Sequence, residues 1–260
     1  MMISYKTQTD NMSQQIREER MMTQRAFPEL DNTRLTILVG FSGSGKTECA
    51  VNLALALENL GHPTALADLD VVNPYFRSRE RRELLQQHNI RLVATSQACV
   101  DADVPALPAE LNTLLQDEGL FSVLDIGGGP VGARVLARYR PKLLNQPHRV
   151  CFVLNANRPG TGTTEKALNS LREIEATLGL PATHIIHNTH LCRETTPEDI
   201  LAGAELAREV SASSGLPILC HTAHEPLIHA LSPLNEPVLP LRLYMNKPWE
   251  EEEDALCVPF

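Results

Sequence analysis

The feature that most constrains this chain is a glycine-rich segment at residues 40–47. It reads G-F-S-G-S-G-K-T, which matches the pattern G-x-x-x-x-G-K-[ST] without a break, and it lies between an apolar run at 35–39 and a run of helical period. In a strand–loop–helix unit, such a loop turns its backbone N–H groups inward at the positive end of a helix. The motif therefore predicts a phosphate-binding loop in an α/β fold.

The residue types in this loop indicate separate roles. Lys46 is expected to reach the β- and γ-phosphates of a nucleoside triphosphate, and the hydroxyl of Thr47 is expected to bind Mg²⁺. Glycines let the backbone approach the phosphates closely. The residues expected to contact the nucleotide are Gly40, Ser42, Gly43, Ser44, Gly45, Lys46, Thr47 and Glu48.

From residue 34 onward, short β-rich apolar runs alternate with longer runs of helical period, which is typical of βαβ units. We predict a three-layer α/β P-loop NTPase fold with a mainly parallel central sheet. Strands are expected at 35–39, 64–68, 90–94, 121–125, 149–154, 184–188 and 217–220, with a weaker edge strand within 238–245. Helices are expected at 45–59, 78–88, 107–117, 130–144, 163–178 and 197–213, the last capped by Thr196.

Composition and charge bound the organisation of the chain. The 260 residues, 43% of them hydrophobic, can bury the core of one domain at 34–246. A polar segment at 1–33 is expected to be a mobile extension, and an acidic tail is expected at 247–260. The net charge of −9 argues against a nucleic-acid partner, and no apolar stretch approaches the ~18 residues of a membrane span. The scattered cysteines are expected to be mostly reduced core thiols, as in a cytoplasmic protein.

Two strand ends carry carboxylates that a bound Mg²⁺ would need. Asp125 ends the strand at 121–125 and begins a D-x-x-G pattern whose glycine, Gly128, can contact a γ-phosphate. Asp68 and Asp70 end the strand at 64–68, and the alternation of an extended chain points both the same way. Ligands of parallel sheets bind at the carboxyl ends of strands, so these carboxylates are expected near the metal. Solvated turn aspartates are the alternative.

The phosphate loop, the Asp68-x-Asp70 strand end and the Asp125-x-Gly127-Gly128 pattern occur in the order found in one family class. Over about residues 34–225 the chain resembles the MinD/ParA/CobQ class of P-loop nucleotide-binding proteins, and its segments 68–80 and 125–133 are similar to those of a bacterial branch of that class. The resemblance implies that Asp70 positions the attacking water and that Asp68 lies nearer the magnesium.

The same resemblance implies a base-binding role for Asn188, since an Asn after a later strand commonly contacts the base in this class. Its amide can both donate to and accept from an adenine edge. A guanine-binding N-K-x-D motif needs an aspartate where this chain has Leu191. The expected ligands are therefore ATP and Mg²⁺ rather than GTP.

One departure from the class concerns a second, early-loop lysine, which reaches across a nucleotide-sandwich dimer. Phe41 stands at that position, so the resemblance does not supply the dimer contact and leaves a homodimer open. Arg77 or Arg79 could provide a replacement cation. The favoured alternative is that both belong to a charged helix face, with Arg79 spaced i,i+4 from Glu83.

Two further groups have no diagnostic pattern. The segment 155–159, N-A-N-R-P, is expected to face the ligand crevice, either as a plain loop or as part of a partner or substrate surface. Several histidines and cysteines have the chemistry of zinc ligands without the spacing of a zinc site, and they are expected to be scattered polar or core residues. These are His184, His187, His190, Cys192, Cys220, His221 and His224.

Together these residues favour a protein that binds Mg-ATP and hydrolyses it slowly through Lys46, Asp70 and Asp125. It would act as a nucleotide-dependent switch for an unidentified protein partner. Two alternatives remain. One is an ATP-dependent kinase or ligase with a small-molecule substrate, and the other is a non-catalytic nucleotide-binding module.

Overall fold

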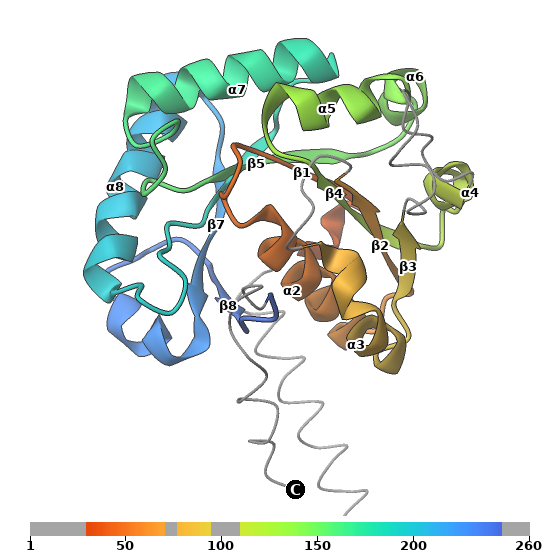
Figure 1. Cartoon of the computed structure of the whole chain (residues 1–260), viewed down its shortest axis with the longest axis horizontal. Helices are drawn as coiled ribbons and strands as arrows, with labels where there is room; N and C mark the ends of the chain where they lie inside the picture. The colour runs from red at the N-terminus through yellow and green to blue at the C-terminus, as the bar shows by residue number, and fades with distance from the viewer. Residues whose placement is uncertain (1–29, 71–76, 95–109, 246–260) are drawn as a thin grey trace, which may run out of the picture.

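The computed structural model describes residues 30–70, 77–94 and 110–245 of the chain. In this part the chain alternates between strands and helices, as the sequence predicts (Figure 1). The strands are β1 (Leu35–Val39), β2 (Thr64–Leu69), β3 (Arg91–Ala94), β4 (Phe121–Ile126), β5 (Arg149–Leu154), β6 (His184–His187), β7 (Ile218–His224) and β8 (Val238–Leu241). The α-helices are α2 (Lys46–Asn59), α3 (Arg82–Gln87), α4 (Glu110–Gln116), α5 (Gly129–Ala137), α6 (Arg140–Leu144), α7 (Thr164–Leu178) and α8 (Pro197–Ser214).

All eight strands form one sheet in the order β3-β2-β4-β1-β5-β6-β7-β8, and every neighbouring pair is parallel. This confirms the predicted α/β P-loop NTPase fold and its parallel sheet. The edge strand predicted within 238–245 is β8, in which Pro240 is exposed at the edge of the sheet. Because all strands run the same way, their carboxyl ends share one edge of the sheet.

Helices cover both faces of the sheet and make a three-layer structure. Figure 1 shows α5, α6 and α7 on one face and α2 and α3 on the other. Apolar residues of α4, α5, α7 and α8 share one buried cluster with the sheet, whereas those of α2 share a second cluster with the opposite face. Several strands are buried along their whole length, which explains why they read as continuous apolar runs.

Helix boundaries follow local chemistry. Helix α8 begins at the predicted cap, Thr196, which forms a capping box with Asp199, and α7 ends at Gly179 in the left-handed conformation. The single helix predicted at 130–144 is wrong, because the chain forms α5 and α6 instead. Pro141 lies in the first turn of α6, where its missing N–H is tolerated, although it would break the interior of a longer helix.

The predicted helix at 78–88 is also divided. Residues Ser78–Arg81 form a 3₁₀ turn, and α3 follows from Arg82. At the start of the described chain, Leu30–Asn32 is a second 3₁₀ turn, and Leu30 is buried against the α2 side of the sheet. The rest of the predicted N-terminal extension, the acidic tail and the start of the helix predicted at 107–117 lie outside the described residues.

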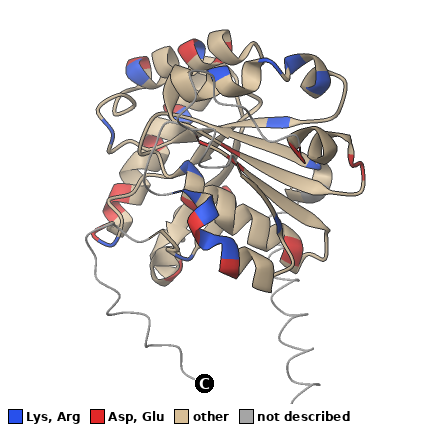
Figure 2. Cartoon of the chain, turned by 45° about the vertical axis from the view of Figure 1, so that its right-hand side comes forward, with Lys and Arg blue, Asp and Glu red and all other residues tan. Residues whose placement is uncertain are grey.

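Charged residues of both signs are interspersed along the helices in the described part of the chain (Figure 2). Among the described helices, none combines the length and apolar character that a membrane crossing requires.

Candidate functional site

The predicted phosphate loop joins β1, a strand in the middle of the sheet, to the first residue of α2. Gly43 and Gly45 adopt left-handed backbone angles, with φ of 73° and 83°. At Gly45 a side chain is also excluded by space, since an added Cβ would lie 2.2 Å from the side-chain nitrogen of Asn188. The sequence therefore forms a tightly curled loop at the N-terminus of a long helix, which is the geometry that binds phosphate.

Lys46 is folded back onto this loop. Its ammonium group donates hydrogen bonds to the carbonyl oxygens of Gly40 and Phe41, at 3.3 and 3.0 Å. Burial lowers the pKa of Lys46, while the nearby carboxylates of Asp125 and Asp70 raise it. The lysine is thus held against the loop by two carbonyl acceptors, and two carboxylates lie close enough to favour its charged form.

Two buried oxygens beside Lys46 have no hydrogen-bond partner among the described residues. They are Oγ of Ser44, in the loop, and Oδ1 of Asp125, at the end of β4. Burial and the neighbouring Asp68 raise the pKa of Asp125 to about 7, whereas Lys46 and the Thr47 hydroxyl lower it. An unpartnered carboxylate oxygen beside a threonine hydroxyl has the chemistry that a Mg²⁺ site requires, so these residues fit the ion.

Asp68 has different surroundings, although it lies directly opposite Asp125 in the register of β2 and β4. Nε and Nη2 of Arg79 bind its two carboxylate oxygens, at 2.7 and 3.0 Å. The backbone N–H of Arg79 donates to the same carboxylate at 3.1 Å. The favoured alternative, in which Arg79 belongs to a charged helix face with Glu83, is therefore wrong, because Arg79 lies in the 3₁₀ turn Ser78–Arg81 and its guanidinium is paired with Asp68. A magnesium role for Asp68 would require this ion pair to open.

Asp70 and the glycines after β4 lie against the loop from the other side. Oδ1 of Asp70 is within 2.8 Å of the position that a Cβ on Gly127 would occupy. A Cβ on Gly128 would lie 2.8 Å from Cα of Ser42, and the N–H of Gly129 donates to the Gly40 carbonyl at 2.9 Å. The structure thus brings the predicted D-x-x-G segment into backbone contact with the phosphate loop.

Asn188 follows β6 and lies under the loop. Its side-chain nitrogen donates to the carbonyl oxygen of Ser44 at 2.8 Å, and its side-chain oxygen accepts a hydrogen bond from the Thr222 hydroxyl at 2.6 Å. The side chain is buried. Its amide therefore holds the loop to the end of β7 rather than presenting both groups to a base.

Glu48 does not point toward the phosphate side of the site. Its carboxylate accepts hydrogen bonds from the backbone N–H groups of Tyr244 and Met245, at 2.7 and 3.1 Å. One turn along α2, Asn52 donates to the carbonyl of Arg242 and accepts from its N–H, at 3.0 and 2.9 Å. Helix α2 thereby fixes the segment 242–245, which is nearly 200 residues away in sequence and which motif analysis does not connect to the loop.

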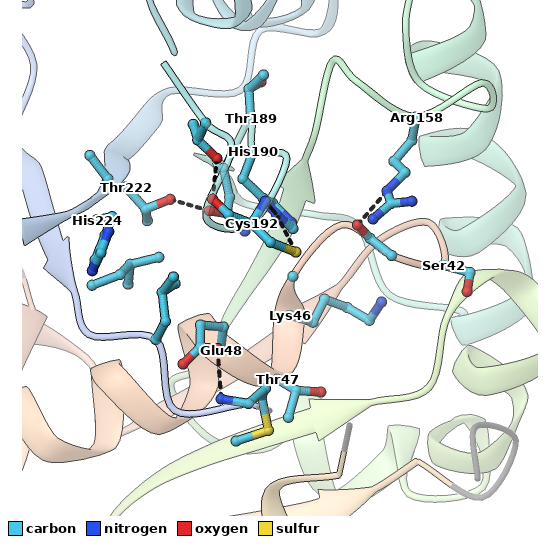
Figure 3. A pocket seen from close by; sticks show the side chains of 18 of the residues that line it. Ser42, Lys46, Thr47, Glu48, Arg158, Thr189, His190, Cys192, Thr222 and His224 are labelled. Atoms are coloured by element: carbon cyan, nitrogen blue, oxygen red, sulfur yellow. Dashed lines mark hydrogen bonds between the residues drawn. The ribbon is translucent and has the colours of Figure 1, made fainter. Parts of the chain in front are cut away.

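A cavity of about 530 Å³ extends from the phosphate loop along the carboxyl edge of the sheet (Figure 3). One end contains loop residues together with Asp70, Gly128 and Arg158. The other end is lined by five apolar residues, Ile200, Ala223, Leu241, Leu243 and Met245, together with Thr222 and His224. The cavity therefore has a charged end that suits phosphates and an apolar end that suits a flat organic group.

The loop after β5 lies over the phosphate loop, as its predicted position at the crevice suggests. The side chains of Asn155 and Arg158 both donate to the carbonyl oxygen of Gly43, at 3.4 and 2.8 Å. The ring of Phe41 approaches Gly160 so closely that a Cβ there would lie 2.5 Å from it. Phe41, which occupies the position of the early-loop lysine of the MinD/ParA/CobQ class, thus packs the phosphate loop against the loop after β5.

The histidines form local pairs. Nδ1 of His187 lies 2.8 Å from Nδ1 of His221, and Nε2 of His187 lies 2.8 Å from the Thr189 hydroxyl. Burial lowers the pKa of His187 to about 3 and that of His190, which lies closer to the phosphate loop, to about 4. Among the described residues, no group of three or more His, Cys, Asp or Glu side chains is arranged to hold a metal ion.

No family model and no curated protein sequence matches the chain. The solved structures that share its fold include the following two. Cell division protein FtsY from Thermotoga maritima is 19% identical, with a TM-score of 0.52 over 76% of this chain and 67% of that one. The signal recognition particle 54 kDa protein from Aeropyrum pernix K1, solved in complex with GDP, is 19% identical, with a TM-score of 0.50 over 74% and 42% of the two chains. The chain therefore spans only part of these proteins, and the likeness is one of fold.

Proposed function

We propose that this protein binds a magnesium–nucleoside triphosphate in the cavity, with its phosphates on the loop 40–47, and hydrolyses it slowly. The observation that carries the proposal is the set of unused polar groups around Lys46. Its ammonium group is bonded only to loop carbonyls, and Ser44 and Asp125 each have a buried oxygen without a partner in the described chain. Buried polar groups are normally paired, so such a cluster supports a ligand that pairs them.

In this proposal Thr47 and Asp125 hold Mg²⁺, and Asp68 joins them only if Arg79 releases it. The ion, when bound, neutralises charge on the transferring phosphoryl group. Lys46 and the loop N–H groups bind the phosphate oxygens, and Asp70 orients the attacking water. Catalysis then consists of positioning and charge stabilisation, without a covalent enzyme intermediate.

The proposed nucleotide is ATP. The chain has Leu191 where a guanine-binding N-K-x-D motif has its aspartate. The apolar end of the cavity offers Ala223, Leu243 and Met245 as packing surfaces for a purine ring. GTP is the competing candidate, because one of the proteins that share the fold was solved with GDP bound.

We further propose that nucleotide state is read by a protein partner. The D-x-x-G segment after β4 contacts the loop through Gly128 and Gly129, so a change at the γ-phosphate position would move the start of α5. Val131, in the first turn of α5, is 61% exposed and also lines the cavity. A partner bound at this turn would therefore sense the occupied state.

The test is to measure binding of ATP and GTP, and phosphate release with Mg²⁺, for the wild type, Lys46→Ala and Asp70→Ala. Lys46→Ala should lose triphosphate binding, and Asp70→Ala should bind but turn over at least ~100-fold more slowly. Lys166→Ala is the matched lysine control, because Lys166 is an exposed residue of α7. Wild-type binding and turnover in Lys46→Ala would overturn the proposed site, and tighter binding of GTP than of ATP would overturn the proposed base.

A further inference from the structure

Arg158 places a positive charge beside the phosphate loop with no carboxylate to balance it. Its Nε donates to the Gly43 carbonyl at 2.8 Å, and within the described residues no acidic side chain pairs with its guanidinium. The side chain is half-buried and lines the same cavity as Lys46 and Thr47. Figure 3 shows Arg158 extending down from the loop after β5 onto the phosphate loop. A guanidinium group binds phosphate oxygens in a planar, two-point geometry, so a phosphate in the cavity would be a matching partner for this charge.

The backbone that carries Arg158 is held firmly in place. The Thr161 hydroxyl donates to the carbonyl of Asn155 at 2.7 Å, closing the turn that contains Arg158. The N–H of Ala156 donates to the Thr189 hydroxyl at 3.0 Å, which ties the same turn to the end of β6. The backbone at Arg158 is therefore fixed by the packed ends of β5 and β6, and this fixes the point from which the side chain extends.

The phosphate loop in turn accommodates the arginine. Gly43 has a φ of 73°, and a Cβ at this residue would lie 2.7 Å from Cζ of Arg158. Any larger residue at position 43 would therefore push the guanidinium off the loop. The charge also acts on its surroundings, since Arg158 adds to burial in lowering the pKa of His190.

We propose that Arg158 binds the outermost phosphate of the bound nucleoside triphosphate, in the same chain as the loop. This inference rests on the proposed function. Nε is already used by Gly43, but Nη1 and Nη2 have no partner among the described residues, and together they match two oxygens of one phosphate. Gly43 precedes Lys46 in the loop, on the side where the lysine ammonium group contacts Phe41. This is the end of the phosphate loop at which the γ-phosphate is expected to bind.

The proposal predicts discrimination between triphosphate and diphosphate, which can be measured without turnover. Titration calorimetry would compare a non-hydrolysable ATP analogue with ADP, both with Mg²⁺, for the wild type, Arg158→Gln and Arg158→Lys. The glutamine side-chain nitrogen occupies the position of the arginine Nε, so it can keep the bond to Gly43 without the charge. We expect Arg158→Gln to lose about tenfold to hundredfold in affinity for the analogue and less than threefold for ADP. The affinity of Arg158→Lys for the analogue should lie between those of Arg158→Gln and the wild type.

Arg172→Ala is the matched control, because Arg172 is an exposed arginine on α7 that bonds to Asn169. It should bind both nucleotides like the wild type. If Arg158→Gln loses equal affinity for both nucleotides, or for neither, the assignment of Arg158 is overturned while Lys46-dependent binding keeps the proposed function intact. If the wild type binds no nucleotide, both proposals fail together.

Discussion

The two ends of the cavity differ in how their polar groups are satisfied. At the phosphate end, oxygens of Ser44 and Asp125 lack partners in the described chain, and Arg158 carries an unbalanced charge. Toward the apolar end, two polar side chains are engaged by the protein itself, since Asn188 bonds to both Ser44 and Thr222 and Glu48 accepts two backbone N–H groups. The first set of groups is left available for a ligand, whereas the second set builds the wall of its pocket.

This contrast teaches that residue type alone does not separate ligand contacts from scaffolding. Glu48, which is half-buried, and Asp125, which is fully buried, are both acids beside the loop, and burial raises the pKa of both. Backbone hydrogen bonds from Tyr244 and Met245 lower the pKa of Glu48, whereas Asp68 raises that of Asp125 further. Asp125 is therefore the acid that gains most from a bound cation.

The largest expected effect is at the phosphate end. Asp125→Asn keeps the size of the side chain but removes the charge that would hold Mg²⁺, so magnesium-dependent turnover should fall by about a hundredfold or more. Phosphate release at increasing Mg²⁺ concentration measures this. Asp117→Asn, on the exposed turn before β4, is the control and should behave like the wild type. Unchanged turnover in Asp125→Asn would remove this residue from the metal site.

The apolar end is tested by Glu48→Ala, which frees the two N–H groups that fix the segment 242–245. Loss of the Leu243 and Met245 wall should weaken ATP binding about tenfold, which corresponds to roughly 60 Å² of apolar contact. Inorganic tripolyphosphate has no base, so its affinity should change less than about twofold. Glu48→Gln retains one acceptor and should lie between the alanine variant and the wild type. An equal loss for ATP and tripolyphosphate would place Glu48 in the phosphate site instead.

The sequence could predict the features that local patterns determine, but not the contacts between residues that are distant in the chain. The loop, both aspartate strand ends and the succession of strands and helices along the chain follow from local patterns, namely glycine spacing and alternating apolar runs. The engagement of Glu48 by residues 244 and 245, and of Asp68 by Arg79, depends on contacts that no local pattern encodes. Asn188 lines the cavity, but its engagement by the distant Thr222 could not be predicted from a local pattern.

A smaller effect is expected from pH, measured as stability without ligand. The raised pKa of Asp125, about 7 against a normal 3.8, means that the folded state keeps a proton that the unfolded state loses. The free energy of unfolding should therefore decrease between about pH 4 and 7, by up to ~1.4 kcal/mol per pH unit from this group. His187, with its pKa lowered to about 3, contributes the opposite slope below pH 6.5.

The difference between wild type and Asp125→Asn in denaturant titrations at pH 5, 6 and 7 isolates the aspartate, because both proteins contain His187. The variant should gain stability relative to the wild type as pH rises. Parallel curves would mean that the Asp125 carboxyl titrates normally. Asp125 would then not be the acid that gains more than Glu48 from a bound cation.

The smallest effect on nucleotide choice is expected at Asn188, even though its removal should be costly to the fold. Asn188→Ala leaves the Ser44 carbonyl and the Thr222 hydroxyl without this partner, so the free energy of unfolding should fall by about 1–3 kcal/mol. The ratio of ATP to GTP affinity should nevertheless change less than about twofold, because the amide is directed at the loop and not at the base. Calorimetric titration of both nucleotides gives the ratio.

Asn188→Asp retains an acceptor for Thr222 but places a carboxylate against the Ser44 carbonyl, so it should weaken the binding of both nucleotides by the same factor. A tenfold change in the ratio for either variant would instead make Asn188 a base-binding residue and would move it from the scaffold to the ligand site.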